Sequence, residues 1–351
     1  MTRVPLRDRE SGISVDAMRR IDRWAGVPLC ALATVLLRLW WLVRPPPRRP
    51  VQRILFIELS EMGSTILADP AMRRARARAG AELYFAIFAC NADSLALTNT
   101  IPAGNIFTIR TASLWLLAKD TLRFLVWTRR NAIDSVVDFE LFSRFSGLLT
   151  GLSGATRRVG FHRFHNEGLY RGAMLTHRVA YNPHIHIAKN FIALVDALLS
   201  LAPTVPYTKE IIGDEELNVA LSPPDRASMD KLATRIEALA SQARPGRLVL
   251  VSPHAGDMLP QRRWMGERFV ELMRRILAAN DDVLVLITGA AGERAEAEHL
   301  AAQCASDRCI VLAGRLALKE LPALYALATV MVANDSGAAH FAAASGLPTI
   351  V

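Results

Sequence analysis

Apolar and polar positions alternate in two long series along this chain. In the first series, short runs rich in Val, Ile, Leu and Phe are separated by segments of helical length. Such runs are typical of buried parallel strands, because helices cover both faces of the sheet. They predict strands at 53–59, 82–88, 105–110 and 132–140.

The second series repeats the pattern more cleanly. It predicts strands and intervening helices in turn, with strands at 247–252, 282–289, 309–314 and 328–335 and helices at 268–279 and 293–304. Strand and helix in alternation build doubly wound sheets. We therefore expect two Rossmann-like α/β domains with a cleft between them.

The same pattern predicts the division of the chain. We expect a basic segment at 1–50, an N-terminal domain at 51–206, a helical connection at 207–245 and a C-terminal domain at 246–351. The sequence stops in GLPTIV, which has the composition of the start of a further buried strand. We therefore expect the C-terminal domain to be truncated.

Residues 24–43 (WAGVPLCALATVLLRLWWLV) are apolar apart from Arg38. About 20 apolar residues are enough to cross a bilayer, and Trp40 and Trp41 suit its interface. Arginines on both sides give no clear orientation, so a helix lying in the membrane surface is equally compatible. A core helix of an N-terminal subdomain is the third interpretation. The Pro-rich stretch at 44–50 is a stiff spacer.

Charge separates this N-terminal region from the rest. The chain has 351 residues, with 42 Lys and Arg against 33 Asp and Glu, a formal net charge of +9. Residues 1–53 hold eleven Arg and four acids, so they carry +7 of that charge. The body is nearly neutral and has no recognisable nucleic-acid motif, which argues against a nucleic-acid partner. Arginines around an apolar helix instead indicate an anionic membrane surface.

Several classes of protein are disfavoured. Four scattered cysteines are too few for a disulfide framework, and Cys304 and Cys309 have no second Cys or His pair to complete a zinc site. The chain has neither GxGxxG after a strand nor GxxxxGK[ST], which argues against a dinucleotide-dependent dehydrogenase and a P-loop enzyme.

The loop at 59–70 is the first candidate site, since ligands bind at the carboxyl ends of parallel strands. Gly63 allows a tight turn, and Ser64 and Thr65 are good residues to cap the helix that follows. Glu61 is the nearest loop carboxylate.

Two loops in the second series are the next candidate sites. In the loop at 252–264, Arg262 precedes a helix, where its guanidinium could lie over a phosphate. In the segment at 287–301, a strand leads through glycines into a helix with Glu293 in its first turn.

The loop at 332–351 is the most specific. Asp335 ends a strand, Ser336 is expected to cap a helix, and Gly337 lets a ligand approach the amides at the positive helix end. His340 follows Ser336 by four residues and so falls on the same helix face. This combination indicates a site for a sugar diphosphate.

In order and spacing, the four loops resemble those of glycosyltransferase family 9, the heptosyltransferases of the lipopolysaccharide inner core. The resemblance extends over residues 53–351. It is strongest in NDSGAAHFAAASGLPTI and in the Arg262-Arg263-Trp264 step, and it is fair in LSEMGSTILADPAM.

This resemblance implies a GT-B fold and an inverting transfer from an ADP-activated heptose or related nucleotide sugar, with no required metal and no cofactor. It implies that the C-terminal domain binds the donor, with Asp335, Ser336, Gly337 and His340 near the diphosphate and sugar. Arg262 would balance phosphate charge, and Glu293 could contact the nucleoside.

One position departs from the family pattern. The family loop ends in Gly-Asp, and that Asp is taken to be the general base, whereas this chain has Ser64 there. A serine hydroxyl without an adjacent base does not accept a proton at neutral pH. Either Glu61 has taken over the role, or the acceptor geometry differs, or the protein is a membrane-anchored nucleotide-sugar binder without catalysis.

The expected partners follow from these interpretations. They are a nucleotide sugar and a lipid-linked glycan acceptor, such as the lipopolysaccharide core, at the cytoplasmic face of the inner membrane. An inverting transferase for another nucleotide sugar is the alternative within enzymes.

Overall fold

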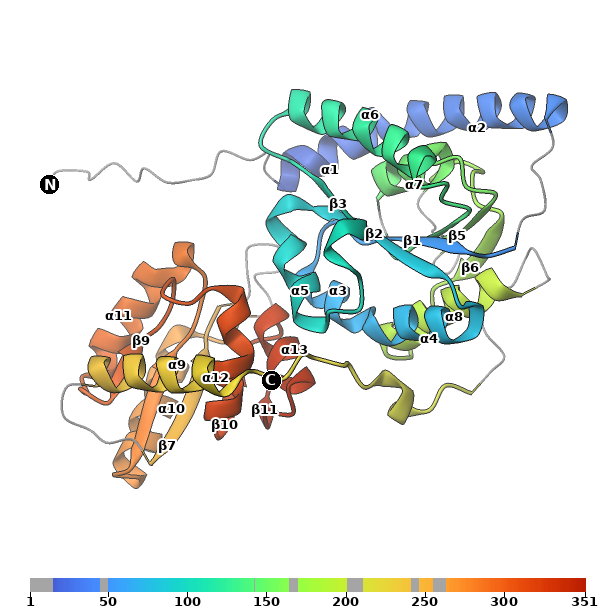
Figure 1. The fold of residues 1–351 in the computed structure, drawn as a ribbon. Coiled ribbons are helices and arrows are strands. Elements are labelled where there is room, and N and C mark those ends of the chain that lie inside the picture. Colours follow the sequence, from blue (N-terminus) through green and yellow to red (C-terminus); the bar gives the residue numbers. More distant parts are fainter. Residues whose placement is uncertain are drawn as a thin grey trace, which may run out of the picture. The chain divides into compact units, whose positions relative to one another are not determined.

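A computed structural model describes residues 15–44, 50–141, 143–163, 170–200, 211–240, 246–254 and 263–351 (Figure 1). The chain divides into two compact units. Unit 1 comprises residues up to Leu95 together with Thr100–Asn218, and unit 2 comprises Ala96–Asn99 together with Val219–Val351. Each unit is described by itself.

Unit 1 is built on a six-stranded parallel sheet with the order β3-β2-β1-β4-β5-β6. The strands are β1 (Arg53–Ile57), β2 (Glu82–Phe88), β3 (Ile106–Ile109), β4 (Ser135–Asp138), β5 (Arg157–Arg163) and β6 (His177–Ala180). In this order the winding reverses between β1 and β4, which is the defining feature of a doubly wound sheet.

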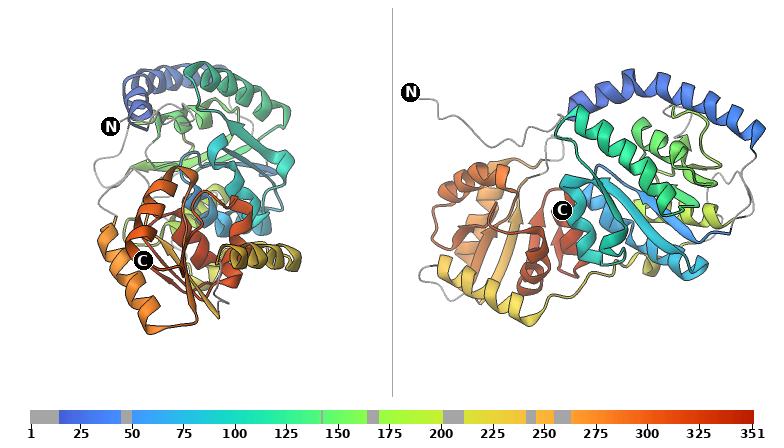
Figure 2. Two further views of the ribbon diagram at one scale, coloured as in Figure 1. Left: turned by 90° about the vertical axis from the view of Figure 1, so that its left-hand side faces the viewer. Right: turned by 45° about the horizontal axis from the view of Figure 1, so that its top comes forward.

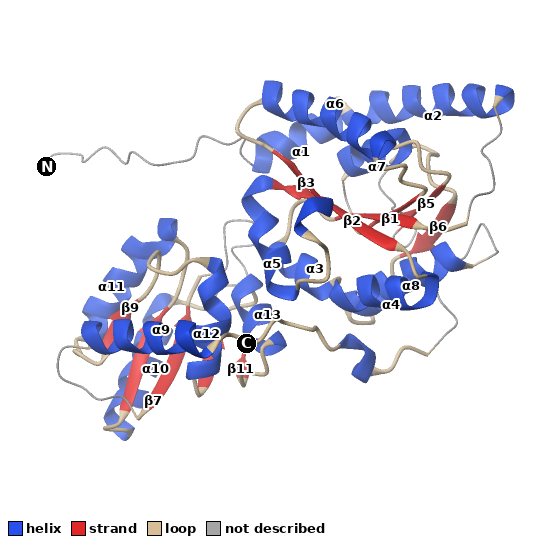
Figure 3. Cartoon of the chain, in the orientation of Figure 1, coloured by secondary structure: helices blue, strands red, loops and turns tan. Residues whose placement is uncertain are grey.

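Helices cover both faces of this sheet (Figures 1 and 3). They are α1 (Val15–Trp24), α2 (Gly26–Val43), α3 (Met62–Leu67), α4 (Asp69–Ala79), α5 (Leu95–Thr98), α6 (Leu114–Arg130), α7 (Arg144–Leu152) and α8 (Ile187–Leu199). Gly80, with φ of 59°, ends α4 in the left-handed conformation that glycine adopts at low cost.

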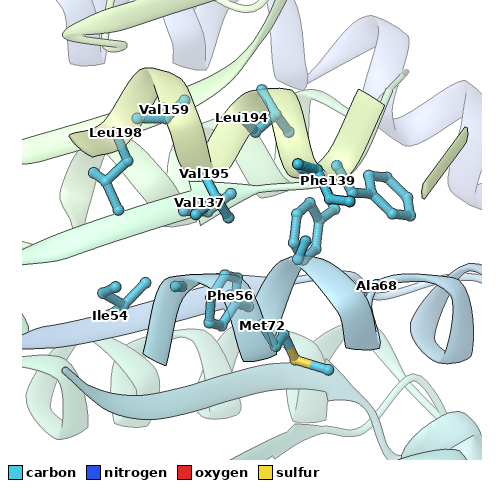
Figure 4. Close-up of a cluster of buried hydrophobic side chains, with 14 of the residues drawn as sticks. Ile54, Phe56, Ala68, Met72, Val137, Phe139, Val159, Leu194, Val195 and Leu198 are labelled. Atoms are coloured by element: carbon cyan, nitrogen blue, oxygen red, sulfur yellow. The ribbon is translucent and has the colours of Figure 1, made fainter. Parts of the chain in front are cut away.

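Alternate residues along the strands point to the two faces. One set packs against α4 and α8 in a buried cluster (Figure 4). Figure 4 labels Ile54, Phe56, Ala68, Met72, Val137, Phe139, Val159, Leu194, Val195 and Leu198 of this set. The other set, including Leu55 and Val136, packs against Phe124 of α6 and Leu149 of α7. Burial on both faces explains why these strands are continuous apolar runs.

Unit 2 has a five-stranded parallel sheet with the order β11-β10-β7-β8-β9. Its strands are β7 (Arg247–Ser252), β8 (Val283–Ile287), β9 (Cys309–Val311), β10 (Val330–Ala333) and β11 (Thr349–Ile350). Its helices are α9 (Arg226–Leu239), α10 (Gly266–Ala279), α11 (Arg294–Cys304), α12 (Leu321–Leu327) and α13 (Gly337–Ala344). The winding reverses between β7 and β10.

The predicted fold class is confirmed, because both sheets are parallel and covered by helices. Two strands, β5 and β6, were not predicted. Their sequences, RRVGFHR and HRVA, contain Arg and His where buried strands usually have aliphatic residues. The units also divide the chain differently from the predicted boundaries, since α1 and α2 pack on unit 1 and α9 packs on unit 2 (Figure 2).

Candidate functional site

Polar residues of unit 1 gather where the winding of its sheet reverses. Ile57 at the end of β1 pairs with Asp138 at the end of β4, so the loops that follow these strands start side by side. Glu140 links them. Its carboxylate accepts the N–H groups of Leu59 and Ser60 at 2.9 and 3.0 Å and the Ser60 hydroxyl at 2.7 Å. The loop after β1 is therefore held by the loop after β4.

Glu58 is a second buried carboxyl at this edge, with only 4% of its surface exposed. Burial raises the pKa of Glu58 well above its ordinary value, and the charges of Glu140 and Glu61 raise it further. Burial also raises the pKa of Glu140 and of Asp138. Of these groups, Glu58 has the strongest tendency to be protonated, because a second effect, the neighbouring carboxylates, adds to its burial.

Asp138 has a compensating partner. The guanidinium of Arg171, itself buried, forms an ion pair with the Asp138 carboxylate and donates to Ser146 Oγ at 2.9 Å. Ser146 Oγ in turn donates to Asp138 at 3.1 Å. A buried carboxylate paired in this way holds the start of α7 against the end of β4.

The predicted capping of the first loop is wrong. Helix α3 begins at Met62, so Glu61 is the N-cap residue and Gly63 and Ser64 lie inside the helix. The Ser64 hydroxyl, which is then not needed as a cap, donates to Glu61 Oε2 at 2.9 Å. Glu61 is exposed. The structure thus brings together the two residues that the sequence singled out in this loop.

Unit 2 has its own polar edge, at the reversal between β7 and β10. Asn334, directly after β10, is buried and makes two hydrogen bonds through its side chain. Its Oδ1 accepts the N–H of Trp264 at 2.9 Å, and its Nδ2 donates to the carbonyl of Pro253 at 2.7 Å. Asn334 therefore fixes both described ends of the segment that joins β7 to α10.

His254 follows β7 and is buried. Its Nδ1 lies 3.2 Å from Glu296 Oε2, and its Nε2 has no hydrogen-bond partner among the described residues. A Cβ atom at Gly289 would lie 2.8 Å from the His254 ring and 2.9 Å from Glu293 Oε2. Glycine at 289 is what allows the loops after β7 and β8 to approach this closely.

Glu293 has a local role in this arrangement. Its Oε2 accepts the N–H of Ala290 at 2.7 Å and so stabilises the turn before α11. The predicted nucleoside contact of Glu293 stays a prediction. Arg262 lies outside the described residues, whereas Arg263 and Trp264, which follow it, are exposed.

The predicted residues after β10 lie together at the start of α13. Ser336 is the N-cap residue, as expected, but its hydroxyl makes no capping hydrogen bond. Its Oγ is buried with no partner among the described residues. His340 Nε2 lies 3.8 Å from Asp335 Oδ1, and Gly337 is the first helical residue. A buried hydroxyl at the positive end of a helix is an arrangement suited to an anionic ligand.

Comparison with known proteins decides the family. A search of curated proteins gives no match. The profile of glycosyltransferase family 9 (heptosyltransferase) matches residues 129–351, well over half of the chain. The chain belongs to glycosyltransferase family 9. It is therefore a glycosyltransferase.

Solved structures agree with a family 9 fold. One similar structure is ADP-heptose LPS heptosyltransferase II of E. coli, with a TM-score of 0.65 and 18% identity, covering 85% of this chain and 83% of that one. Another is a family 9 glycosyltransferase of Veillonella parvula, with a TM-score of 0.64 and 15% identity, covering 86% of this chain and 80% of that one. E. coli heptosyltransferase WaaC with ADP-2-deoxy-2-fluoro heptose is also similar, with a TM-score of 0.56 and 18% identity, covering 85% of this chain and 87% of that one. The GT-B fold is that of this family.

Four polar residues at these edges are not among the predicted site residues: Glu58, Glu140, His254 and Asn334. Each lies within two residues of the end of a predicted strand. That position was a usable signal, since a charged or amide residue there faces the ligand edge of a parallel sheet.

Proposed function

We propose that this family 9 enzyme transfers a heptose or similar sugar from a nucleotide donor, with inversion and without a metal, to a lipid-linked glycan. The observation that carries the proposal is the hydrogen bond from Ser64 to Glu61. It supplies an ordered carboxylate in the loop where the family pattern has its base.

Glu61 is the general base in this proposal. Ser64 occupies Oε2 of Glu61, which leaves Oε1 to accept the proton of the acceptor hydroxyl. Glu58 is a poor alternative, because it is buried and its raised pKa favours the protonated form. Ser64 positions the base rather than replacing it.

In the transfer, the acceptor oxygen forms a bond to the anomeric carbon while the bond from that carbon to the diphosphate oxygen breaks. The acceptor proton passes to Glu61, and the electron pair of the broken bond leaves with the nucleoside diphosphate. Amides at the start of α13, with His340 beside them, suit the charge that develops on the diphosphate. Arg262 is assigned the same task.

The donor is proposed to be an ADP-sugar. Support comes from the similar structures, because WaaC is described with ADP and with ADP-2-deoxy-2-fluoro heptose. Glu293 and His254 border the same strand-end edge and are the candidate contacts for the nucleoside. A ligand that binds only the folded state raises its melting temperature by mass action. An ADP-sugar should therefore raise it, and UDP- and GDP-sugars should not.

The acceptor is proposed to be lipid-linked, with the enzyme at the cytoplasmic face of the inner membrane. Helix α2, 18 residues long with a mean hydropathy of 1.8, is long and apolar enough to span a membrane. An enzyme that carries such a helix is suited to substrates embedded in lipid.

Glu61→Gln tests the mechanism. We expect kcat to fall about 100-fold, because the amide does not accept the proton, while the affinity for the nucleotide stays unchanged. Ser64→Ala should lower kcat only about threefold, since it removes an orienting bond and leaves the base. Glu237→Gln, an exposed glutamate of α9, is the matched control. An unaltered rate in Glu61→Gln would remove this residue from the mechanism, and absence of any transfer or donor hydrolysis by the unmodified chain would favour a silent binder.

A further inference from the structure

Helix α2 is docked along one side of unit 1. Its inward residues recur at helical spacing, and they are Gly26, Cys30, Ala33, Thr34, Leu37 and Trp41. Cys30 and Ala33 form a buried cluster with Met174, and Leu148 and Leu152 of α7 pack against it. A Cβ atom at Gly26 would lie 2.8 Å from the Arg144 side chain, so α2 begins in close contact with the start of α7.

Polar contacts reinforce this docking. Asp22 Oδ1 accepts the N–H groups of Arg144 and Phe145, both at 2.9 Å, and so caps α7 from α1. The N–H of Ala173 donates to Thr34 Oγ1 at 2.9 Å. A helix leaving this site to cross a bilayer would strand these groups without partners, which is unfavourable for buried donors. The docked position and a membrane-spanning position therefore exclude each other.

The opposite side of α2 is apolar and exposed. Its large side chains have 48–80% of their surface exposed, and they are Leu29, Leu32, Val35, Leu36, Leu39, Trp40, Leu42 and Val43. Arg38 is the single charge within the helix. Soluble proteins rarely expose a continuous apolar area of this kind unless it binds something.

Helix α6 adds a second exposed apolar row. Trp115, Leu122 and Val126 are 75%, 67% and 49% exposed, and their spacing places them on one face of the helix. Lys119 lies on the same face between Trp115 and Leu122, and Arg123 lies at its border. An apolar face bordered by basic residues is typical of helices that lie in a membrane interface.

The two helices lie on the same side of unit 1. Both pack against α7, and the views in Figures 1 and 2 show α2 and α6 running near one another over the same layer. We call the outward faces of α2 (residues 27–43) and α6 (residues 115–126) the platform.

Basic groups outnumber acidic ones around the platform. The described side chains of α1, α2 with its C-cap, and α6 include nine basic groups, which are Arg19, Arg20, Arg23, Arg38, Arg44, Lys119, Arg123, Arg129 and Arg130. The carboxylates among these side chains are both engaged in ion pairs, Asp22 with Arg144 and Asp120 with Arg110 and with Arg123 of the same helix. This charge complements an anionic lipid surface.

We propose that the platform binds the surface of an anionic bilayer with α2 lying in the membrane plane, docked on unit 1 throughout. The apolar residues of both helices enter the headgroup and upper acyl region, and the arginines contact lipid phosphates. This inference concerns membrane binding alone and does not depend on the proposed reaction.

Vesicle binding tests the contribution of α6. The full chain should bind vesicles of phosphatidylcholine with phosphatidylglycerol more tightly than phosphatidylcholine alone. Trp115→Ser combined with Leu122→Ser should weaken binding at least about tenfold, because two large apolar side chains no longer enter the lipid. Ile211→Ser, which removes an apolar side chain of unit 1 that is 97% exposed, is the matched control and should bind like the unmodified chain. Equal binding by the α6 variant would overturn the shared platform.

The depth of α2 tests its orientation. Leu29→Cys, Leu36→Cys and Val43→Cys, each in a Cys90→Ser background, place a spin label at three positions on one face, about 21 Å from first to last. An in-plane helix gives the same shallow depth at all three. A label at 36 that is much deeper than those at 29 and 43 would show a spanning helix and overturn the proposal.

A second copy of the chain is the other partner that could cover the platform, and it must be distinguished from a bilayer. Sedimentation without lipid should show no dimer that depends on the platform. A dimer abolished by Trp115→Ser with Leu122→Ser, in a chain that binds no vesicles, would identify the platform as a contact between copies and overturn the proposal.

Discussion

Both sheets place their polar residues beside the strand at which the winding reverses, β1 in unit 1 and β7 in unit 2. The edge of unit 1 gathers carboxyl groups, and burial raises the pKa of two of them, Glu58 and Glu140. The edge of unit 2 has an amide, two histidines that each lie near a carboxylate, and the positive end of α13. One topology thus carries two different sets of polar groups. In the proposed reaction, the exposed Glu61 at the first edge takes up the acceptor proton, and the start of α13 at the second edge receives the leaving diphosphate.

Asn334→Ala should give the largest change in stability, and this change should be confined to unit 2. The variant loses two buried hydrogen bonds and leaves the Pro253 carbonyl and the Trp264 N–H unpaired, so we expect unit 2 to lose about 2–4 kcal/mol of unfolding free energy. Urea unfolding followed by Trp264 fluorescence measures it. Ser345→Ala, which removes a hydroxyl bonded within α13, is the control. An unchanged midpoint for Asn334→Ala would mean that the two loops do not depend on this residue.

His340→Ala should sharpen the assignment of unit 2 as the diphosphate side. We expect the dissociation constant for ADP to rise about tenfold, equivalent to about 1.4 kcal/mol, because a potential donor beside the α13 amides is lost. Calorimetric titration measures it. His299→Ala, an exposed histidine of α11, is the matched control and should bind ADP normally. Equal affinities in the two variants would contradict the assignment.

Glu58→Gln should give the smallest change, and one that depends on pH. Because the pKa of Glu58 is raised in the folded state, its contribution to stability is complete below the unfolded pKa and is lost as pH rises through the folded pKa. Glutamine resembles the protonated acid and does not titrate. The melting temperature of the variant should therefore match that of the unmodified chain near pH 4 and exceed it by several degrees at pH 8. A constant difference at both pH values would show that packing, and not protonation, is responsible.

Local pattern was sufficient for most of the fold. The runs at 82–88 and 247–252 coincide with β2 and β7 because these strands are buried on both faces. Strand β5 escaped because Arg158 is buried in it, and its burial depends on a carbonyl of Met174 at 2.6 Å and on the Trp41 ring at 4.4 Å. Neither partner is close in sequence, so no local pattern shows that a guanidinium is satisfied there.

Prediction of the candidate sites was also limited by contacts between residues that are distant in sequence. The predicted ends of the strands indicated where polar residues would gather. Glu61, Ser64 and the residues after β10 do lie at these ends of the two sheets. The roles of Glu140 and Asn334 depend on pairing between segments about 80 residues apart. The start of α3 at Met62 was missed because Glu61, a weaker N-cap than serine, takes that position.

The contact between Asp22 and the start of α7 has a consequence for synthesis. The two partners are 122 residues apart, so α1 and α2 leave the ribosome long before the surface that receives them exists. During that interval the apolar side of α2 that will pack on α7 is uncovered together with the side that stays exposed. The surface that receives α2 includes Met174 as well as α7, so it is complete only after residue 174 has been synthesised, and an arrest before that point should increase capture of the nascent chain by chaperones or by the membrane insertion machinery.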